Sequence, residues 1–84
     1  MKITIEYCAA WNYLPRATSL VEKMKEDLNL SAELIKSDGG VYEITMNGEL
    51  IYSKRKTGVF PEESEIIDKV RERMWYMRRP TGWP

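Results

Sequence analysis

Cys8 is the only thiol in the 84-residue chain, and no histidine accompanies it. Without histidine the chain cannot form a Ser/His or Cys/His catalytic pair, and it offers no imidazole ligand to a metal. A single cysteine also excludes an internal disulfide and a multi-cysteine zinc or iron–sulfur site. We therefore expect no metal site. The chemistry left open is that of one thiol among carboxylates, lysines and arginines.

Composition and charge predict one small domain. With 43% hydrophobic residues, a chain this short has room for one hydrophobic core. Its 13 basic and 13 acidic side chains cancel, so no overall field draws it to nucleic acid or anionic lipid. No apolar run approaches the ~20 residues that cross a bilayer, and residues 1–7 alternate where a signal peptide is continuously apolar. We predict a single domain over residues 1–84, with a loose tail at 80–84 and a cytoplasmic location.

The first part of the chain has the pattern of a strand, a helix and a second strand. Residues 2–7 alternate with period 2, which predicts a half-buried strand. One face carries Ile3, Ile5 and Tyr7, and the other carries Lys2, Thr4 and Glu6. Pro15 suits the first turn of a helix, and the apolar stripe that follows predicts a helix over about 15–28. The apolar segment at 32–35 ends in a turn cluster at 37–40 that is too short to contain a helix, so the next element is a strand.

The second part begins with a hairpin. Residues 41–46 alternate, and Asn47-Gly48 is a strong two-residue hairpin turn because both positions tolerate positive φ. Residues 49–53 return as the antiparallel partner. The polar segment at 53–58 is then expected to be a loop.

Pro61 is predicted to open a second long helix, whose first turn is acidic and whose last turns are basic, as the helix dipole favours; Pro80 ends it. The predicted order is β-α-β-β-β-α. Because Lys2, Thr4 and Glu6 need a wet face, both helices should cover the opposite face of the sheet. The fold class is therefore α/β with two layers and a right-handed parallel crossover. The residues themselves leave open whether the second and third strands pair directly.

Residues 7–17 resemble the start of the selenoprotein W, or Rdx, family, which reads Tyr-Cys-x-x-(Cys or selenocysteine) before an aromatic residue and a proline. Residues 39–44 resemble the family's Gly-x-Phe-Glu-Val strand, 47–54 its hairpin with a Ser-Lys ending, and 58–61 its entry into the last helix. The resemblance covers nearly the whole chain in order. It implies a thioredoxin-like, four-stranded mixed sheet in the order 2-1-3-4, with the redox pair in the loop between the first strand and the first helix.

This sequence departs from the family pattern at the second redox position, where it has Trp11. An internal disulfide cannot close, so Cys8 is left with monothiol chemistry, a mixed disulfide with glutathione or a partner protein. The resemblance thus implies possible oxidoreductase-like activity with catalytic Cys8, no cofactor, and glutathione as a co-substrate at most. We expect Cys8 to be partly accessible, and we assign binding roles to Trp11, Gly40, Val41 and Arg16.

The alternative is a redox-silent binding module. A free cysteine is often a small buried hydrophobe, and the surface around Trp11 and Val41 would then serve a protein partner. Trp11 can be interpreted as a binding wall beside the thiol, as a plug over it, or as core. Tyr13 and Tyr42 are expected to be packing residues.

Two basic groups suggest a nucleic-acid or phosphate site, but neither is expected to form one. The run at 54–56 is typical of a solvated loop. The second group mixes aromatic and basic residues as single-strand binders do, although packing at the helix end explains it better. It comprises Trp75, Tyr76, Arg78, Arg79 and Trp83. We predict no nucleic-acid partner and no membrane partner.

Overall fold

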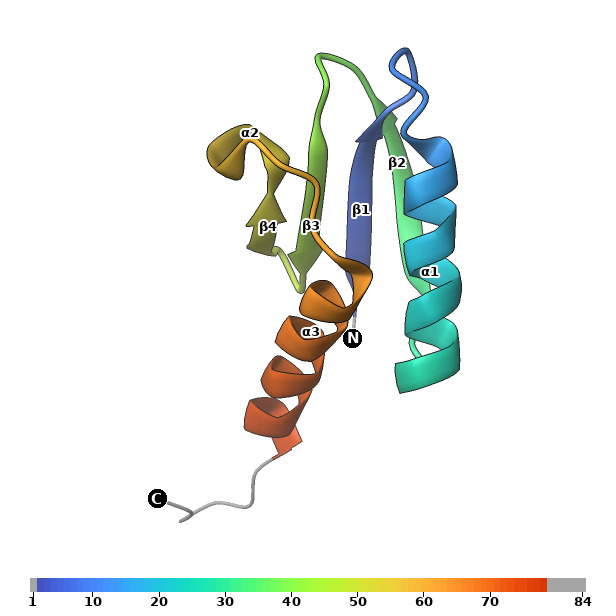
Figure 1. The fold of residues 1–84 in the computed structure, drawn as a ribbon. Helices are drawn as coiled ribbons and strands as arrows, with labels where there is room; N and C mark the ends of the chain where they lie inside the picture. Colours follow the sequence, from blue (N-terminus) through green and yellow to red (C-terminus); the bar gives the residue numbers. More distant parts are fainter. Residues whose placement is uncertain (1, 79–84) are drawn as a thin grey trace.

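The computed structural model describes the backbone of residues 2–78 and the side chains of residues 2–74. The predicted tail at 80–84, the helix end at Pro80 and the side-chain packing around Trp75 and Trp83 lie outside these described residues. The elements, labelled in Figure 1, are β1 (Ile3–Cys8), α1 (Leu14–Leu28), β2 (Ala32–Ser37), β3 (Tyr42–Met46), β4 (Glu49–Ser53), α2 (Lys54–Thr57) and α3 (Glu63–Arg78).

The four strands form one mixed sheet in the order β2-β1-β3-β4. β1 pairs in parallel with β2, from Ile3 opposite Ala32 to Cys8 opposite Ser37. β1 also pairs antiparallel with β3, and β3 pairs antiparallel with β4 across the Asn47 turn. The order implied by the family resemblance is confirmed, and the second and third strands do not pair directly.

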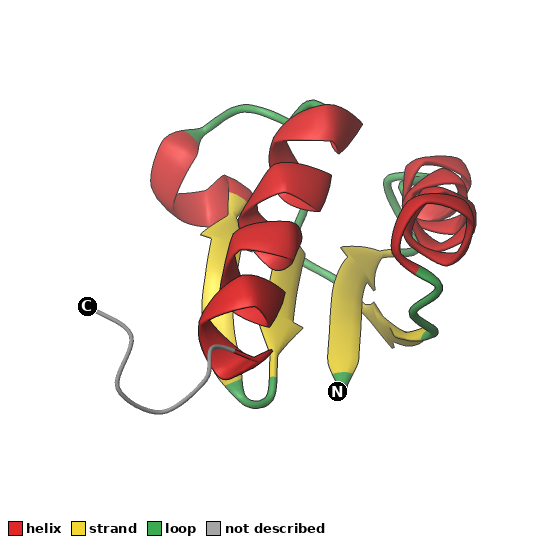
Figure 2. Ribbon diagram, turned by 90° about the horizontal axis from the view of Figure 1, so that it is seen from below, coloured by secondary structure: helices red, strands yellow, loops and turns green. Residues whose placement is uncertain are grey.

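Both long helices lie on the same face of the sheet, as Figure 2 shows. α1 packs on β1 and β2, α3 packs on β4, and the two helices contact each other. The alternation of β1 explains this arrangement, because Ile3 and Ile5 are buried while Thr4 and Glu6 remain half-exposed. On the open face the hydroxyls of Thr4 and Thr45 share a hydrogen bond. The predicted two-layer arrangement is therefore confirmed.

Two details of the sequence prediction are wrong. The polar segment after β4 is not all loop, because residues Lys54–Thr57 form the short helix α2. Gly58 ends it in the left-handed region at φ 78°, and its N–H donates to the carbonyl of Lys54 over 2.7 Å. The last helix begins at Glu63, two residues after Pro61.

The core fills the space between the sheet and the two long helices. Its members come from β1, α1, β3, β4 and α3, and burial of each large aliphatic side chain contributes about 1.5–3 kcal/mol. The largest fully buried aliphatic ones are Ile3, Ile5, Leu20, Met24, Ile44, Met46, Ile66 and Val70. Among the helices of the described residues, none combines the length and the hydropathy needed to cross a membrane.

We predict that Ile44→Ala lowers the free energy of unfolding by about 2–5 kcal/mol, because it opens a cavity in the centre of the core. Ile44 is 0% exposed on β3, whereas Ile35 on the edge strand β2 is 42% exposed. The matched change Ile35→Ala should therefore lower the same quantity by under about 1 kcal/mol. Urea denaturation followed by circular dichroism gives both values. Equal losses in the two variants would contradict the assigned core.

Candidate functional site at the carboxyl end of β1

Cys8 is the last residue of β1 and is completely buried, with 0% of its surface exposed. Its N–H donates to the carbonyl of Val41 over 2.9 Å, and its carbonyl accepts from the N–H of Tyr13 over 3.2 Å. The next residue, Ala9, is held to the end of β2 by its N–H donating to Ser37. The expectation that Cys8 is partly accessible is wrong, because the strand end is fixed between the β1–α1 loop and the start of β3.

Trp11, which stands at the second position of the family-like motif, is exposed. Its side chain is 61% exposed, so it is not a core residue. Its ring lies directly against Gly40, where an added Cβ would be only 2.6 Å from the ring atom Cζ3. Gly40 also has φ 75°, a conformation that favours glycine. The structure thus brings together Trp11, Gly40, Val41 and Cys8, as the family resemblance implied.

Four aromatic side chains meet beside this loop, and we call them the aromatic cluster. They come from the β1–α1 loop, the start of β3 and the segment before α3, and they are Trp11, Tyr13, Tyr42 and Phe60. The centroid of Phe60 lies 4.5 Å from that of Tyr13 and 5.1 Å from that of Tyr42. Trp11 and Tyr13 meet edge to face at 6.1 Å. Such contacts contribute about 0.5–1.5 kcal/mol per pair beyond area burial.

Two cations lie over the aromatic cluster. Cζ of Arg16 is 4.2 Å from the centroid of Phe60, and Nζ of Lys54 is 5.3 Å from the same centroid and 5.6 Å from that of Tyr13. Arg16, predicted as a binding residue, is therefore at this end of the molecule, on Phe60. Sequence reasoning did not place Phe60 and Lys54 in this site. The signals were that Phe60 lies in the family-like segment 58–61, and that Lys54 ends the family-like segment 47–54 and begins the basic run at 54–56.

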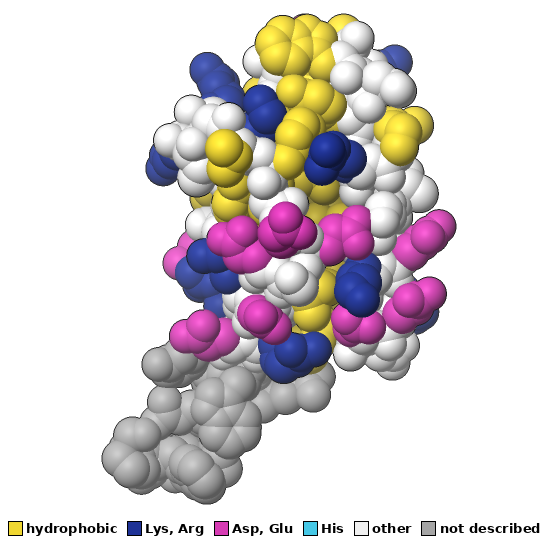
Figure 3. All heavy atoms as spheres, viewed as in Figure 1, with side chains coloured by type: hydrophobic (Ala, Val, Ile, Leu, Met, Phe, Trp, Pro, Cys, Tyr) yellow, Lys and Arg dark blue, Asp and Glu magenta, His cyan; other side chains and the backbone are white. Residues whose placement is uncertain are grey.

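Hydrogen bonds hold the segment after α2 in place. The hydroxyl of Tyr52 donates to the carbonyl of Val59 over 2.7 Å and lies 2.8 Å from the hydroxyl oxygen of Thr57. The side chain of Val59 nevertheless remains 60% exposed, and that of Leu14 is 44% exposed. In Figure 3 hydrophobic and basic side chains gather at the upper end of the face shown, and acidic side chains form a band below them. The exposed apolar side chains are thus presented by a fixed backbone.

Burial raises the pKa of Tyr42 to about 12, with a further rise from the carboxylate of Glu63 and a smaller opposing effect from Arg16. The hydroxyl donates to the carbonyl of Arg16 over 3.3 Å, which also requires the neutral phenol. Tyr42 is therefore a packing residue, as predicted, and it keeps its proton across the physiological range.

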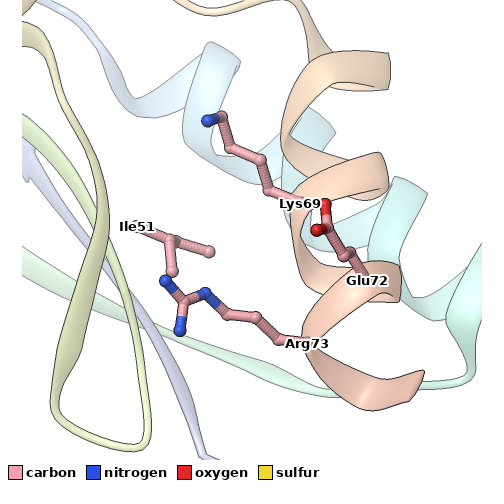
Figure 4. Close-up of a pocket in the computed structure, with 4 residues that line it drawn as sticks. All are labelled: Ile51, Lys69, Glu72 and Arg73. Carbon is pink, nitrogen blue, oxygen red and sulfur yellow. The ribbon is translucent and has the colours of Figure 1, made fainter. Parts of the chain in front are cut away.

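Two open hollows lie along β4 and α3, and the second of them reaches α2. One of about 270 Å³ is lined by Ile51, Lys69, Glu72 and Arg73, and Arg73 reaches from α3 toward Ile51 in Figure 4. The guanidinium of Arg73 forms an ion pair with Glu49 at 2.5 Å. The other, of about 280 Å³, extends along β4 to α2. Neither contains a cysteine, so the candidate site stays at the end of β1.

We predict that Gly40→Ala is more destabilising than Gly39→Ala. Both glycines have positive φ, near 75°, so both substitutions incur backbone strain of roughly 1 kcal/mol. A Cβ at Gly39 meets nothing within 4 Å, whereas one at Gly40 overlaps the ring of Trp11. Gly40→Ala should lower the free energy of unfolding by about 0.5–1.5 kcal/mol more, because the exposed ring must leave its present rotamer, and it should shift the indole N–H resonance of Trp11. Equal losses without that shift would show that the ring contact is unimportant.

A second prediction concerns alkaline pH. The pKa of Tyr42 rises from 10.0 in the reference state to about 12 in the folded protein, so above pH 10 the unfolded chain loses a proton that the folded chain keeps. Ionisation then favours unfolding, and stability falls as pH rises from 10 to 12. Relative to Tyr42→Phe, the parent should lose at most about 2–3 kcal/mol over this range. Urea unfolding at several pH values tests this, and parallel curves for the two proteins would contradict it.

Comparison with known proteins gives the same family as the sequence motifs. Residues 2–72 match the Rdx family. The chain is 31% identical over 72 residues to migration and invasion enhancer 1 of Bos taurus, covering 84% of this chain and 63% of that protein. It is 26% identical over 74 residues to selenoprotein W of Danio rerio, covering 83% of this chain and 86% of that protein. The chain therefore spans less than two thirds of the bovine relative.

Solved structures agree with the fold. The selenoprotein W-related protein from Vibrio cholerae superposes with a TM-score of 0.79 at 28% identity, covering 84% of this chain and 92% of that one. A protein from Bordetella parapertussis gives a TM-score of 0.79 at 28% identity, covering 86% and 95%. The matching residues, the sheet order and the strand-end loop lead to one conclusion: the chain belongs to the Rdx family and has its selenoprotein W-like, thioredoxin-like fold.

Proposed function

We propose that this chain acts by binding a protein partner at the carboxyl end of β1, and that its thiol is closed in the folded state. The observation that carries the proposal is the contrast between the two redox positions. Trp11, at the second position, is 61% exposed, while Cys8, at the first, is 0% exposed. A large exposed aromatic ring is the side chain most often found at the centre of protein interfaces. A buried thiol has no access to another sulfur.

The proposed surface is already ordered before any partner arrives. Trp11 rests on Gly40 and on the edge of Tyr13, and Tyr13 is held by Phe60. Binding would therefore not have to immobilise these side chains, and the entropy loss on association is smaller when a surface is pre-organised. This supports recognition by the exposed ring.

A second candidate function is monothiol exchange at Cys8, giving oxidoreductase-like activity. The observation that favours it is the position of Cys8 at the end of β1, which is the redox position of the Rdx family. In that reaction the Cys8 thiolate attacks one sulfur of glutathione disulfide, a protein–glutathione disulfide forms, and one glutathione thiolate leaves. No further cofactor is needed. The β1–α1 loop would first have to open.

The cytoplasmic location remains a prediction from the sequence.

We predict that the folded protein resists thiol reagents. Native protein incubated with glutathione disulfide should show no adduct by intact-mass spectrometry, and Cys8 should be alkylated at least about 100-fold more slowly than in urea, because reaction requires opening of the structure. The control is Ala10→Cys in a Cys8→Ala background, since residue 10 is exposed in the same loop. The new thiol of that variant should react with both reagents in the folded state, because no opening of the structure is needed.

A single glutathione adduct on the native protein, removed by an external dithiol, would overturn the closed-thiol proposal and establish the second candidate. Trp11→Cys tests the loop geometry separately. If the family's redox loop is retained, mild oxidant should close a disulfide between Cys8 and the new cysteine. Failure to close it would indicate that the loop no longer supports the family's chemistry in any form.

A further inference from the structure

We infer that the surface around Trp11 recognises an acidic protein segment that carries an apolar or aromatic anchor. This inference rests on the proposed function and adds the chemistry of the partner. Two features of the described residues support it: the apolar side chains exposed beside the aromatic cluster, and the cations that lie over and next to that cluster.

The apolar part of the surface is the exposed fraction of three side chains. Trp11 is 61% exposed, Val59 60% and Leu14 44%, and they belong to the β1–α1 loop, the segment before α3 and the start of α1. Trp11 contacts Tyr13, and Tyr13 contacts Phe60, the residue after Val59. An apolar or aromatic anchor from a partner would remove these side chains from water, which is the main source of affinity in small interfaces.

The charged part of the surface is basic. Arg16 and Lys54 lie over the rings of the aromatic cluster, and Arg55 follows Lys54 on α2 with an exposed side chain. Lys56, by contrast, lines the hollow along β4 together with Glu65. The three ion pairs found among residues 2–74 are Lys23–Asp27, Arg71–Asp68 and Arg73–Glu49, so none neutralises Arg16, Lys54 or Arg55. Carboxylates of a partner would meet them beside the apolar anchor.

The distribution of acidic residues restricts how the partner lies. On the face in Figure 3 the acidic side chains form a band below the apolar and basic end, and Glu63 lies near enough to Tyr42 to raise its pKa. A partner carboxylate placed there would be repelled, whereas one at Lys54 would be attracted. An acidic segment is thus confined to the upper end of this face.

A protein segment fits this surface better than a nucleic acid. Single-stranded nucleic acid needs several open ring faces on which successive bases stack. Tyr13, Tyr42 and Phe60 pack against one another, and Arg16 and Lys54 lie over the rings of Phe60 and Tyr13. Trp11 alone among the four presents a largely exposed ring.

The test uses four synthetic 12-residue peptides titrated into the ¹⁵N-labelled protein. The first is rich in Asp and Glu with a central Leu-Trp anchor; the second has those acids changed to amides, the third to lysine, and the fourth keeps the acids but replaces the anchor with serines. The first should bind with a dissociation constant below about 1 mM, shifting the Trp11 indole and the amides of Lys54 and Val59. The other three should bind at least about tenfold more weakly, because each lacks either the charge or the anchor.

Variants identify the surface. Trp11→Ala should weaken the first peptide at least about tenfold, and Lys54→Gln about threefold, since an exposed pair is weak and screened by salt. Lys69→Gln, an exposed cation beside the hollow at Ile51, is the matched control and should change nothing. Equal binding of the amide peptide, with Trp11→Ala still disruptive, would overturn the acidic chemistry but retain protein recognition at Trp11. Binding unaffected by Trp11→Ala, or no binding by any peptide, would overturn the inference, and the former would also remove the proposed function.

Discussion

The structure depends on one constraint, that the sheet has a single apolar face. The strict alternation of β1 and β3 places Ile3, Ile5 and Ile44 on that face, and both long helices must cover it because the other face carries Glu6 and Glu43 in direct opposition. Like charges opposite each other are unfavourable and are tolerated only where water screens them. One face of the sheet is therefore buried under the helices, and the other faces water.

That constraint also determines where the candidate site lies. β1, β2 and β4 run in one direction and β3 in the other. The chain therefore leaves β1, β2 and β4, and enters β3, at the same end of the sheet. The loops at this end are joined by side-chain packing. The aromatic cluster supplies it, because Tyr13 precedes α1, Tyr42 begins β3 and Phe60 precedes α3. Rings from three distant parts of the sequence thus pack against one another at this end of the sheet.

The sequence was sufficient for the parts of the fold that local patterns determine. Period-2 alternation identified β1 and β3, Asn47-Gly48 identified the hairpin, and the apolar stripe after Pro15 identified α1. The order of the strands came from the family resemblance, because the pairing of β2 with β1 joins residues far apart in sequence. The helix α2 was missed because four polar residues carry little helical signal, and only the conformation of Gly58 closes its last turn.

The motif indicated which residues lie near the end of β1 but not how exposed each of them is. Cys8, Trp11, Gly40 and Val41 are together, as the motif implied, yet which of them faces water depends on how the loops pack. The backbone of Cys8 is hydrogen-bonded to Val41 on one side and to Tyr13 on the other, and no periodicity in residues 7–15 reports those contacts. Phe60 was missed for the same reason, since its partners Tyr13 and Arg16 are more than forty residues earlier in the chain.

At the end of β1 the Trp11 side chain is exposed and the Cys8 side chain is buried. This difference in exposure affects any reaction of the thiol. A thiol reacts only when another sulfur can reach it. Here the backbone of Cys8 is hydrogen-bonded on both sides and the Trp11 ring is packed on Gly40, so reaching the sulfur means disturbing the contacts that hold the outer surface. A partner that binds on Trp11 as it stands stabilises the closed loop and leaves Cys8 buried. The proposed recognition and thiol exchange would therefore compete at this end of the molecule, and a protein that did both would need a partner that binds the opened loop.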